Sequence, residues 1–437
     1  MKRGAAIGLL FAASAYACNL HASPEDLFGY GTRTSAMGAT GVAHATGYEA
    51  AFHNPAGAAG IHADKLTLGF MGATFRLNAV GDGLPGRISS EAARGTYIGA
   101  ELPLPLGGVL AKRIGIALAF YEPTDVVVRG RVLYPEKTQF PILPDRAQSV
   151  TIRAGIGADI GYGIRVGAGF AALAEIMGDV VAATDATGRV GTKVEDQLVA
   201  TYAPVFGATY ALPLKGPEIW RVGVVYRGTL DARFSVIIDG SKLSTLNIPL
   251  FNISGTAQYD PAQFAVEIAR IEELNVLAAQ FTFKRWSSFP GILEPTVVCT
   301  EGGPGACGLT PPKIDWRDTF VVRIGADQGF ELQKGLVLHA RSGAFFETSP
   351  LPSSLPGADA YDIPSKTTVT LPTRYFDSDR LALTFGTGLA IAKPVPIDLD
   401  LFVQYHYLLP RTIESPGSSG ESSGSITVFG MTAGVTF

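Results

Sequence analysis

Arginine side chains recur along this sequence at positions opposite to regularly spaced apolar residues. They are Arg153, Arg165, Arg221, Arg227, Arg323, Arg341 and Arg380, and the acidic residues Asp159, Glu175, Asp327, Asp398 and Asp400 share their face. A charge removed from water needs a partner, so ion pairs across an enclosed space are one interpretation. The other is that an unmatched arginine binds a ligand carboxylate with two hydrogen bonds. The candidates for that role are Arg153, Arg165, Arg323 and Arg341.

Residues 231–260 form a second candidate binding element, because this connection is rich in apolar side chains. An exposed segment of this composition requires an explanation. Two explanations are compatible with it. The segment packs over the open end of the protein, or it forms a surface groove for a lipophilic ligand. The candidates for ligand contacts are Phe234, Ile237, Leu250 and Phe251.

Two cysteines, Cys299 and Cys307, follow the N-terminal apolar stretch and are separated by seven residues, three of them glycine. This spacing can close a small disulfide loop in an oxidising compartment. No histidine and no third cysteine lie nearby in the sequence to complete a metal site. We therefore predict a disulfide, and we expect neither a metal site nor a cofactor.

The six histidines sit in no recognised catalytic pattern; they are His21, His44, His53, His62, His339 and His406. Hydrolysis needs a nucleophile, a base and a group that orients the base. His339 and His406 are predicted to face inward on separate strands, so a barrel hydrolase stays open as the weaker alternative. We expect that the protein is not an enzyme.

Strict alternation of apolar with small or polar residues defines the elements that position these side chains. The pattern runs through 150–160 and, after Gly161, through 164–172. Side chains along a strand alternate between its faces, so one face meets lipid and the other lines a narrow polar lumen. Fourteen such segments begin near Lys65, Gly95, Ala111, Val150, Tyr162, Asp196, Ile219, Pro261, Leu274, Arg317, Leu336, Ser378, Pro396 and Gly424.

The connections between these segments alternate in length. Tight ones lie at 161, 212–217, 270–273, 328–335 and 392–396, and long ones lie at 122–149, 231–260, 287–316, 347–377 and 409–423. Short periplasmic turns and long external loops are typical of outer-membrane barrels. We predict an all-β fold, a transmembrane antiparallel β-barrel of about 14 strands over residues 61–437, with both termini periplasmic.

The composition agrees with a barrel and excludes other classes. Charged residues are 17% of the 437, against roughly 25% in soluble domains, and 47% are hydrophobic. The one long apolar run lies at the N-terminus, so membrane-spanning helices are not expected. The net charge of −4, without a basic run, argues against nucleic acid as a partner.

The two ends of the chain carry targeting signals. A basic start and an apolar stretch to Cys18 indicate a secretory signal peptide over residues 1–22, cleaved after Ala17 or Ala22. A membrane anchor and a lipidated Cys18 are the weaker alternatives. At the other end, apolar residues occupy every second position back from Phe437, as in outer-membrane insertion signals. We expect localisation to the bacterial outer membrane, contact with its lipid and lipopolysaccharide, and recognition of Phe437 by the barrel assembly machinery.

Residues 23–60 do not alternate and are rich in small side chains. Fourteen strands enclose a lumen too wide for wall side chains alone to fill. We therefore predict that this segment, which we call the hatch, folds inside the barrel as a plug. The candidate gating residues close the segment and are Phe52, His53, Asn54, Pro55, Ala56 and Gly57. Asn54 can bond neighbouring backbone groups as turn residues do, and Pro55 fixes the local backbone, so we predict a turn where the hatch joins the first strand.

Motifs in a fixed order along the chain resemble those of a known family. They are Ala36-Met37-Gly38-Ala39, Ala50, Asn54-Pro55-Ala56-Gly57, Trp286-Ser287-Ser288-Phe289, Asp315-Trp316-Arg317-Asp318-Thr319-Phe320, Arg341-Ser342-Gly343, Ser349-Pro350-Leu351-Pro352 and Asp377-Ser378-Asp379-Arg380. In this order they resemble the outer-membrane transporters for long-chain fatty acids and aromatic hydrocarbons (FadL/TodX type).

The resemblance implies a passive uptake channel for hydrophobic compounds that uses no ATP. Outer loops would capture a fatty acid or an aromatic hydrocarbon, a pocket inside the barrel would bind it, and movement of the hatch would release it through a lateral opening. A structural or secretion-accessory barrel is the alternative function.

Overall fold

The computed structural model describes residues 24–90, 92–124, 128–129, 134–143, 148–184, 190–242, 250–298, 309–362 and 367–437. The predicted signal peptide and both loop cysteines, Cys299 and Cys307, lie outside the described residues. None of the helices in these ranges is long and apolar enough to cross a membrane.

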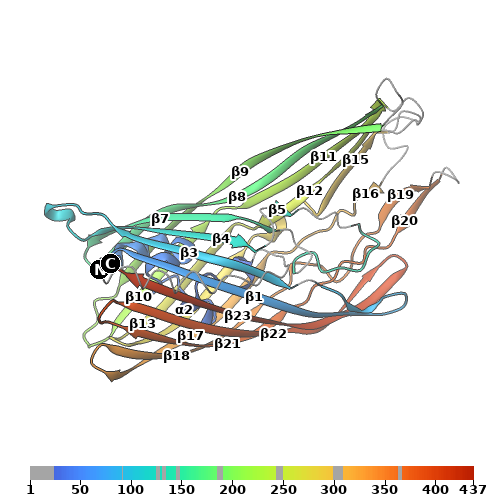
Figure 1. Cartoon of the computed structure of the whole chain (residues 1–437). Coiled ribbons are helices and arrows are strands. Elements are labelled where there is room, and N and C mark those ends of the chain that lie inside the picture. The colour runs from blue at the N-terminus through green and yellow to red at the C-terminus, as the bar shows by residue number, and fades with distance from the viewer. Residues whose placement is uncertain are drawn as a thin grey trace.

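Fourteen antiparallel strands close into a barrel, as the alternation predicted (Figure 1). They are β1 (Lys65–Val80), β3 (Ala93–Pro103), β4 (Ile114–Pro123), β7 (Thr151–Gly161), β8 (Ile164–Thr184), β9 (Val190–Ala211), β10 (Ile219–Arg227), β13 (Gln263–Ile271), β14 (Asn275–Lys284), β17 (Thr319–Gln333), β18 (Leu336–Glu347), β21 (Arg380–Ile391), β22 (Ile397–Ser415) and β23 (Ser418–Thr436). Each pairs with the next along the chain. The last strand, β23, pairs with β1 from Lys65 opposite Thr436 to Val80 opposite Glu421, which closes the barrel.

The two faces of the wall differ as the sequence pattern predicted. On β7, Ile152 and Ile156 are exposed on the outside, whereas Arg153, Gly155 and Gly157 are buried inside. A closed barrel satisfies its backbone hydrogen bonds without a free edge, and its apolar outer face suits lipid. The architecture is therefore that of an outer-membrane β-barrel.

The tight turns lie at one end of the barrel, where the C-terminus also lies (Figure 1). The turn between β7 and β8 shows how short they are. Gly161, Tyr162 and Gly163 have φ values of 88°, 56° and 77°. Glycine adopts positive φ without steric cost, which is why two of these three positions are glycine.

Two hairpins extend well past the barrel at its other end. The predicted long connection at 409–423 is wrong, because β22 and β23 continue until Ser415 pairs with Ser418. The polar residues of this hairpin lie outside the membrane. They therefore need not alternate with apolar residues that face lipid. The hairpin of β8 and β9 is extended in the same way, with Thr184 paired to Val190.

The 231–260 segment is mostly strand rather than loop. Two strands, β11 (Leu230–Lys242) and β12 (Leu250–Asp260), pair antiparallel. The first also pairs in parallel with the outer part of β8, and the second pairs with β15 (Leu293–Val298). Together they build a sheet that continues the wall outward (Figure 1).

Short strands complete the outer end of the molecule. The strand β2 (Gly86–Ile88) pairs with β1, and β5 (Val128–Arg129) pairs with β6 (Gln148–Ser149). A separate small sheet contains β16 (Leu309–Thr310), β19 (Ala358–Asp362) and β20 (Thr367–Leu371). The 3₁₀ turn η4 (Trp286–Ser288) lies in the outer β14–β17 connection, whereas η3 (Gly108–Leu110) lies in the β3–β4 connection at the opposite end.

The hatch fills the lumen with short helices. They are α1 (Pro24–Phe28), α2 (Thr32–Ala36), η1 (Gly47–Glu49), α3 (Ala50–His53) and η2 (Pro55–Gly60). Nearly every residue from Glu25 to Ile61 is buried. The predicted plug inside the barrel is confirmed as a feature of the fold.

Candidate functional site

The centre of the hatch is an aromatic cluster around Tyr30. Its ring lies 4.9 Å from that of Tyr97 on the wall and 5.9 Å from that of Phe52 in the hatch. Its hydroxyl donates to the carbonyl of Phe120 at 3.2 Å. A buried tyrosine needs such a partner for its polar end, so Tyr30 fixes the hatch to the wall by packing and by a hydrogen bond.

The hatch approaches the wall at positions where glycine leaves room for its backbone. A Cβ on Gly207 would lie 1.9 Å from Oδ1 of Asn54, and one on Gly167 would lie 2.2 Å from the amide nitrogen of Ala56. Real Cβ atoms do not approach other atoms so closely. The glycine-lined inner face expected from the sequence therefore makes room for the end of the hatch.

Asn54 links two parts of the hatch to two strands of the wall. Its Nδ2 donates to the carbonyl of Val42 at 2.7 Å and lies 3.2 Å from the carbonyls of Ala208 and Val224, on β9 and β10. Its Oδ1 accepts from the amide of Ala56 at 3.0 Å, and Pro55 opens η2 directly after it. The sequence predicted the local turn, but not the contacts with the two strands.

The other predicted gating residues pack around this turn. Phe52 lies between two cations of the wall, with Arg153 at 4.8 Å and Arg227 at 4.6 Å from its ring centre. The ring of His53 lies edge-on to Phe52, and its Nε2 is 3.3 Å from the carbonyl of Tyr30. Burial lowers the pKa of His53 well below its usual value, with the nearby Arg227 acting in the same direction. The imidazole is therefore neutral.

A buried carboxylate on the wall, Glu267 on β13, anchors the middle of the hatch. It accepts from the backbone amides of Gly41 at 2.6 Å, Val42 at 2.8 Å and Ala43 at 3.0 Å. Gly41 and Val42 share Oε2, whereas Oε1 accepts from Ala43 and lies 2.7 Å from Nδ1 of His44. Sequence reasoning missed this residue. One signal for it was available in the sequence. An acidic side chain occupies an inward position of a strand whose other inward positions are alanine and glutamine.

An ion-pair network surrounds α1 at the outer end of the hatch. Arg153 pairs with Glu25 at 3.1 Å, and Lys284 pairs with Asp26 at 3.1 Å and with Glu347 at 2.7 Å. Arg380 also pairs with Glu347. The carboxylates of α1 therefore lie among cations supplied by the wall.

A second network lies at the inner end of the hatch and is centred on Asp327. Its carboxylate pairs with Arg33 of the hatch at 3.3 Å and with Arg341 at 3.1 Å, and His339 Nδ1 lies 2.9 Å away. Nearby, Glu49 accepts from the backbone amides of Arg33 and Thr34. Burial raises the pKa of Glu49 to about 7, although the positive charge of Arg33 lowers the same pKa.

The four candidate arginines all have partners among the described residues. Arg153 and Arg341 belong to the two networks, Arg165 pairs with Asp159 at 3.4 Å, and Arg323 donates to the carbonyl of Gly38 at 3.2 Å. The candidates Phe234, Ile237, Leu250 and Phe251 lie on β11 and β12, and only their backbone is described. Their contacts with a ligand stay predictions.

Above α1, the mouth of the barrel is lined by aromatic side chains. The ring of Phe289 lies 4.9 Å from that of Trp316 and 4.8 Å from that of Tyr259, and Trp286 lies 5.7 Å from both Tyr259 and Phe289. These residues are contiguous with the buried apolar core of the hatch. The outer mouth therefore joins an apolar surface to the charged network below it.

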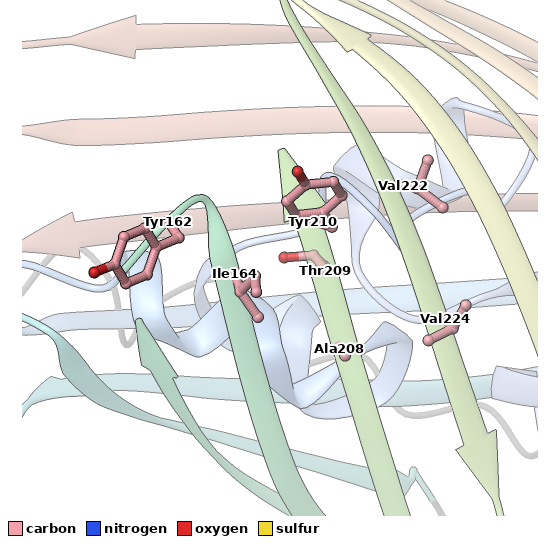
Figure 2. Close-up of a pocket in the computed structure, with 7 residues that line it drawn as sticks. All are labelled: Tyr162, Ile164, Ala208, Thr209, Tyr210, Val222 and Val224. Atoms are coloured by element: carbon pink, nitrogen blue, oxygen red, sulfur yellow. The ribbon is translucent and has the colours of Figure 1, made fainter. Parts of the chain in front are cut away.

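A hollow of about 460 Å³ lies on the outer face of the wall. Figure 2 shows its lining along β8, β9 and β10, which includes Tyr162, Ile164, Tyr210 and Val224. Tyr162 is almost fully exposed at the turn. This groove faces the membrane rather than the lumen.

Within the described residues, no three His, Cys, Asp or Glu side chains are grouped so as to hold a metal ion. The two inward histidines do not meet, because His339 contacts Asp327 while His406 is packed between Phe28 and Phe345.

Solved structures share this fold over nearly the whole length of both chains. A Pseudomonas aeruginosa FadL homologue matches with a TM-score of 0.59 and 14% identity, covering 93% of this chain and 98% of that one. The P. putida toluene transporter TodX matches with a TM-score of 0.58 and 15% identity, covering 94% and 99%. The CymD monoaromatic hydrocarbon channel matches at 0.51 and 15%, covering 93% and 97%.

No protein-family model matches the chain, and no curated protein matches its sequence. At these identities the likeness concerns the fold, and the predicted plugged β-barrel is confirmed.

Proposed function

We propose that this chain is a passive outer-membrane channel that takes up hydrophobic compounds, with the hatch as its gate. The observation that carries the proposal is a lumen closed by a separate segment that noncovalent contacts hold to the wall, as by Glu267 and Asn54. Such a plug can move without opening the barrel, because the strand ladder does not depend on it. Structures described as a toluene transporter and a monoaromatic hydrocarbon channel share the fold, which supports uptake rather than catalysis.

The proposed route starts at the aromatic mouth around Trp286 and Trp316. An apolar compound leaves water there and reaches the network around α1. Displacement of the hatch then opens the way past Phe52 and Asn54, and release follows through the lumen or the wall. The compound moves down its own gradient, so no energy source is required.

The surroundings of the channel belong to the same proposal. The outer face meets membrane lipid, and the outer extensions meet lipopolysaccharide. The exposed side chain of Phe437 at the C-terminus is available to the barrel assembly machinery, and its backbone amide donates to the carbonyl of Asp64 at 2.9 Å.

Uptake by a strain that lacks this protein, with and without the full chain supplied on a plasmid, tests the function. Labelled oleate and toluene are the two probes, and lactose is a hydrophilic control. The proposal expects the chain to restore saturable uptake of at least one hydrophobic probe and to leave lactose uptake unchanged. Unchanged uptake of both hydrophobic probes, with the barrel correctly inserted, would favour a structural or secretion-accessory role.

A further inference from the structure

A second hollow on the outer face of the wall lies over three neighbouring strands, β23, β1 and β3. It has a volume of about 280 Å³, and its lining is Phe70, Gly72, Ala73, Thr74, Ala92, Arg94, Thr124 and Phe429. The strands pair side by side, with Gly72 of β1 opposite both Phe429 of β23 and Arg94 of β3. We call this place the Gly72 hollow.

Gly72 is the reason why the wall is indented here. Met71 and Ala73 on either side of it are buried inside the barrel, so Gly72 points outward, toward lipid. A Cβ at Gly72 would lie 3.0 Å from Cε1 of Phe429 and 3.6 Å from Cγ of Arg94. The missing side chain therefore opens a hollow whose sides are the Phe429 ring and the aliphatic stem of Arg94.

The length of β1 places this hollow near the outer edge of the membrane. The outward positions of the strand run from Leu66 near the tight turns to the exposed Arg76, ten residues later (66 to 76). At about 3.3 Å per residue and a tilt of about 40°, these residues rise about 25 Å, which is the height of the apolar band of such barrels. Arg76 therefore lies at the outer edge of the band, and Gly72 lies just below it.

Aromatic side chains mark the same edge on the neighbouring strands. Tyr405 and Tyr407 are exposed on the outward face of β22. Tyr407 is in register with Ser425 of β23, which is in turn in register with Arg76 of β1. Tyrosine is enriched where membrane meets water, because its ring is apolar and its hydroxyl is polar. The row through Arg76 therefore belongs to the headgroup region.

The outward face carries cations at this edge. Arg94 lines the hollow, and Arg76 is exposed beyond it. A long cationic side chain on an apolar surface keeps its stem on that surface and extends its charge toward the headgroups. An exposed acid on the same face, Glu122 of β4, is opposite Thr96 rather than Arg94. By contrast, the groove in Figure 2 begins at the tight turn and has no charged side chain in its lining.

We propose that the Gly72 hollow is a binding site for lipopolysaccharide, with one acyl chain in the hollow and a lipid A phosphate on Arg94 and Arg76. Guanidinium groups bind phosphate by parallel hydrogen bonds. Lipopolysaccharide forms the outer leaflet of this membrane and joins phosphates to several acyl chains in one molecule. Its chain lies against Gly72 and Phe429, and its phosphate lies at the outer edge of the apolar band. The site faces the membrane, so this inference does not depend on the uptake function.

Native mass spectrometry of the purified full-length protein in an uncharged detergent tests the inference. The probes are lipid A with its phosphates, dephosphorylated lipid A, and phosphatidylglycerol. Dephosphorylated lipid A keeps the acyl chains and lacks the anionic groups, whereas phosphatidylglycerol keeps a phosphate on a smaller lipid. The wild type should bind one molecule of phosphorylated lipid A roughly tenfold more tightly than either of the other probes.

Substitutions separate the charged part of the site from its apolar part. Arg76→Gln and Arg94→Gln in one chain should weaken the binding of phosphorylated lipid A by roughly tenfold and leave dephosphorylated lipid A within about twofold, because each removes one cation beside the phosphate. Gly72→Leu should weaken the binding of both forms of lipid A, because its side chain fills the hollow. Arg113→Gln removes an exposed cation at the opposite end of the barrel and is the matched control, which should change neither.

Heat-modified migration on gels verifies that each variant is a folded barrel. Unchanged binding of phosphorylated lipid A by the double arginine variant, or an equal loss for the dephosphorylated form, would overturn the site. Equally tight binding of phosphatidylglycerol, with the same dependence on the two arginines, would overturn the assignment to lipopolysaccharide in favour of anionic phospholipid. A wild type that binds none of the probes would overturn the inference as well.

Discussion

Replacing Glu267 by glutamine should release the middle of the hatch while leaving the barrel closed. The carboxylate accepts three backbone amide bonds, from Gly41, Val42 and Ala43, and contacts His44. Hydrogen bonds to a charged group contribute about 1.5–3 kcal/mol each. Glutamine keeps one acceptor oxygen, which can serve Gly41 and Val42, while its own NH₂ faces the amide of Ala43. The loss of that bond costs about 1.5–3 kcal/mol, or roughly 10- to 10²-fold in the population with the hatch displaced.

Hydrogen exchange of the amides of Gly41–Ala43, together with channel conductance in planar bilayers, measures this effect. Protection of these amides should fall and open events should become more frequent. Glu272→Gln is the control, because Glu272 pairs with Arg270 in a partly exposed turn, where an ion pair contributes only about 0–1 kcal/mol. If Glu267→Gln leaves both protection and conductance at the level of this control, Glu267 does not anchor the hatch.

Three further predictions concern other contacts. Gly207→Val should displace Asn54 and raise leakage of small solutes, because even the first side-chain atom would lie 1.9 Å from Asn54 Oδ1. Gly107→Val is the control and should leave leakage unchanged, because nothing lies within 4 Å of a Cβ at that position. Because burial raises the pKa of Glu49 from 4.5 to about 7, the folded hatch binds this proton more tightly than the unfolded chain does. The stability of the wild type should therefore fall as the pH rises from 4.5 to 7, and it should fall more than the stability of Glu49→Gln does. Melting temperatures of both proteins across this pH range measure the difference. Cys299 and Cys307 should resist alkylation without reductant, and labelling of both would reject their disulfide.

Much of the fold follows from local patterns in the sequence. A lipid-facing strand must show apolar residues at every second position, so β7 and its neighbours were predicted within a few residues. The hatch was predicted because residues 23–60 lack this alternation and the lumen needs filling. Its end was correctly assigned to a turn, since asparagine followed by proline favours one.

Other features depend on contacts between distant residues and leave little local signal. Outside the membrane a strand needs no apolar face, so the extension of β22 and β23 was read as a loop. The parallel pairing of β11 with β8 joins segments about sixty residues apart in sequence, and no pattern within either strand specifies the other. The partners of Glu267 and of the arginines were likewise not predictable, because alternation gives the face of a side chain but not what lies opposite.

Deletion of residues 24–57 tests most directly the central claim that the hatch is the gate. The barrel ladder closes from β1 to β23 without the hatch, so the truncated chain should still insert as a folded barrel. The account predicts a leaky, non-selective pore with larger conductance, uptake of hydrophobic compounds that no longer saturates, and faster entry of small hydrophilic antibiotics. A correctly inserted truncated barrel with unchanged antibiotic permeability would contradict it.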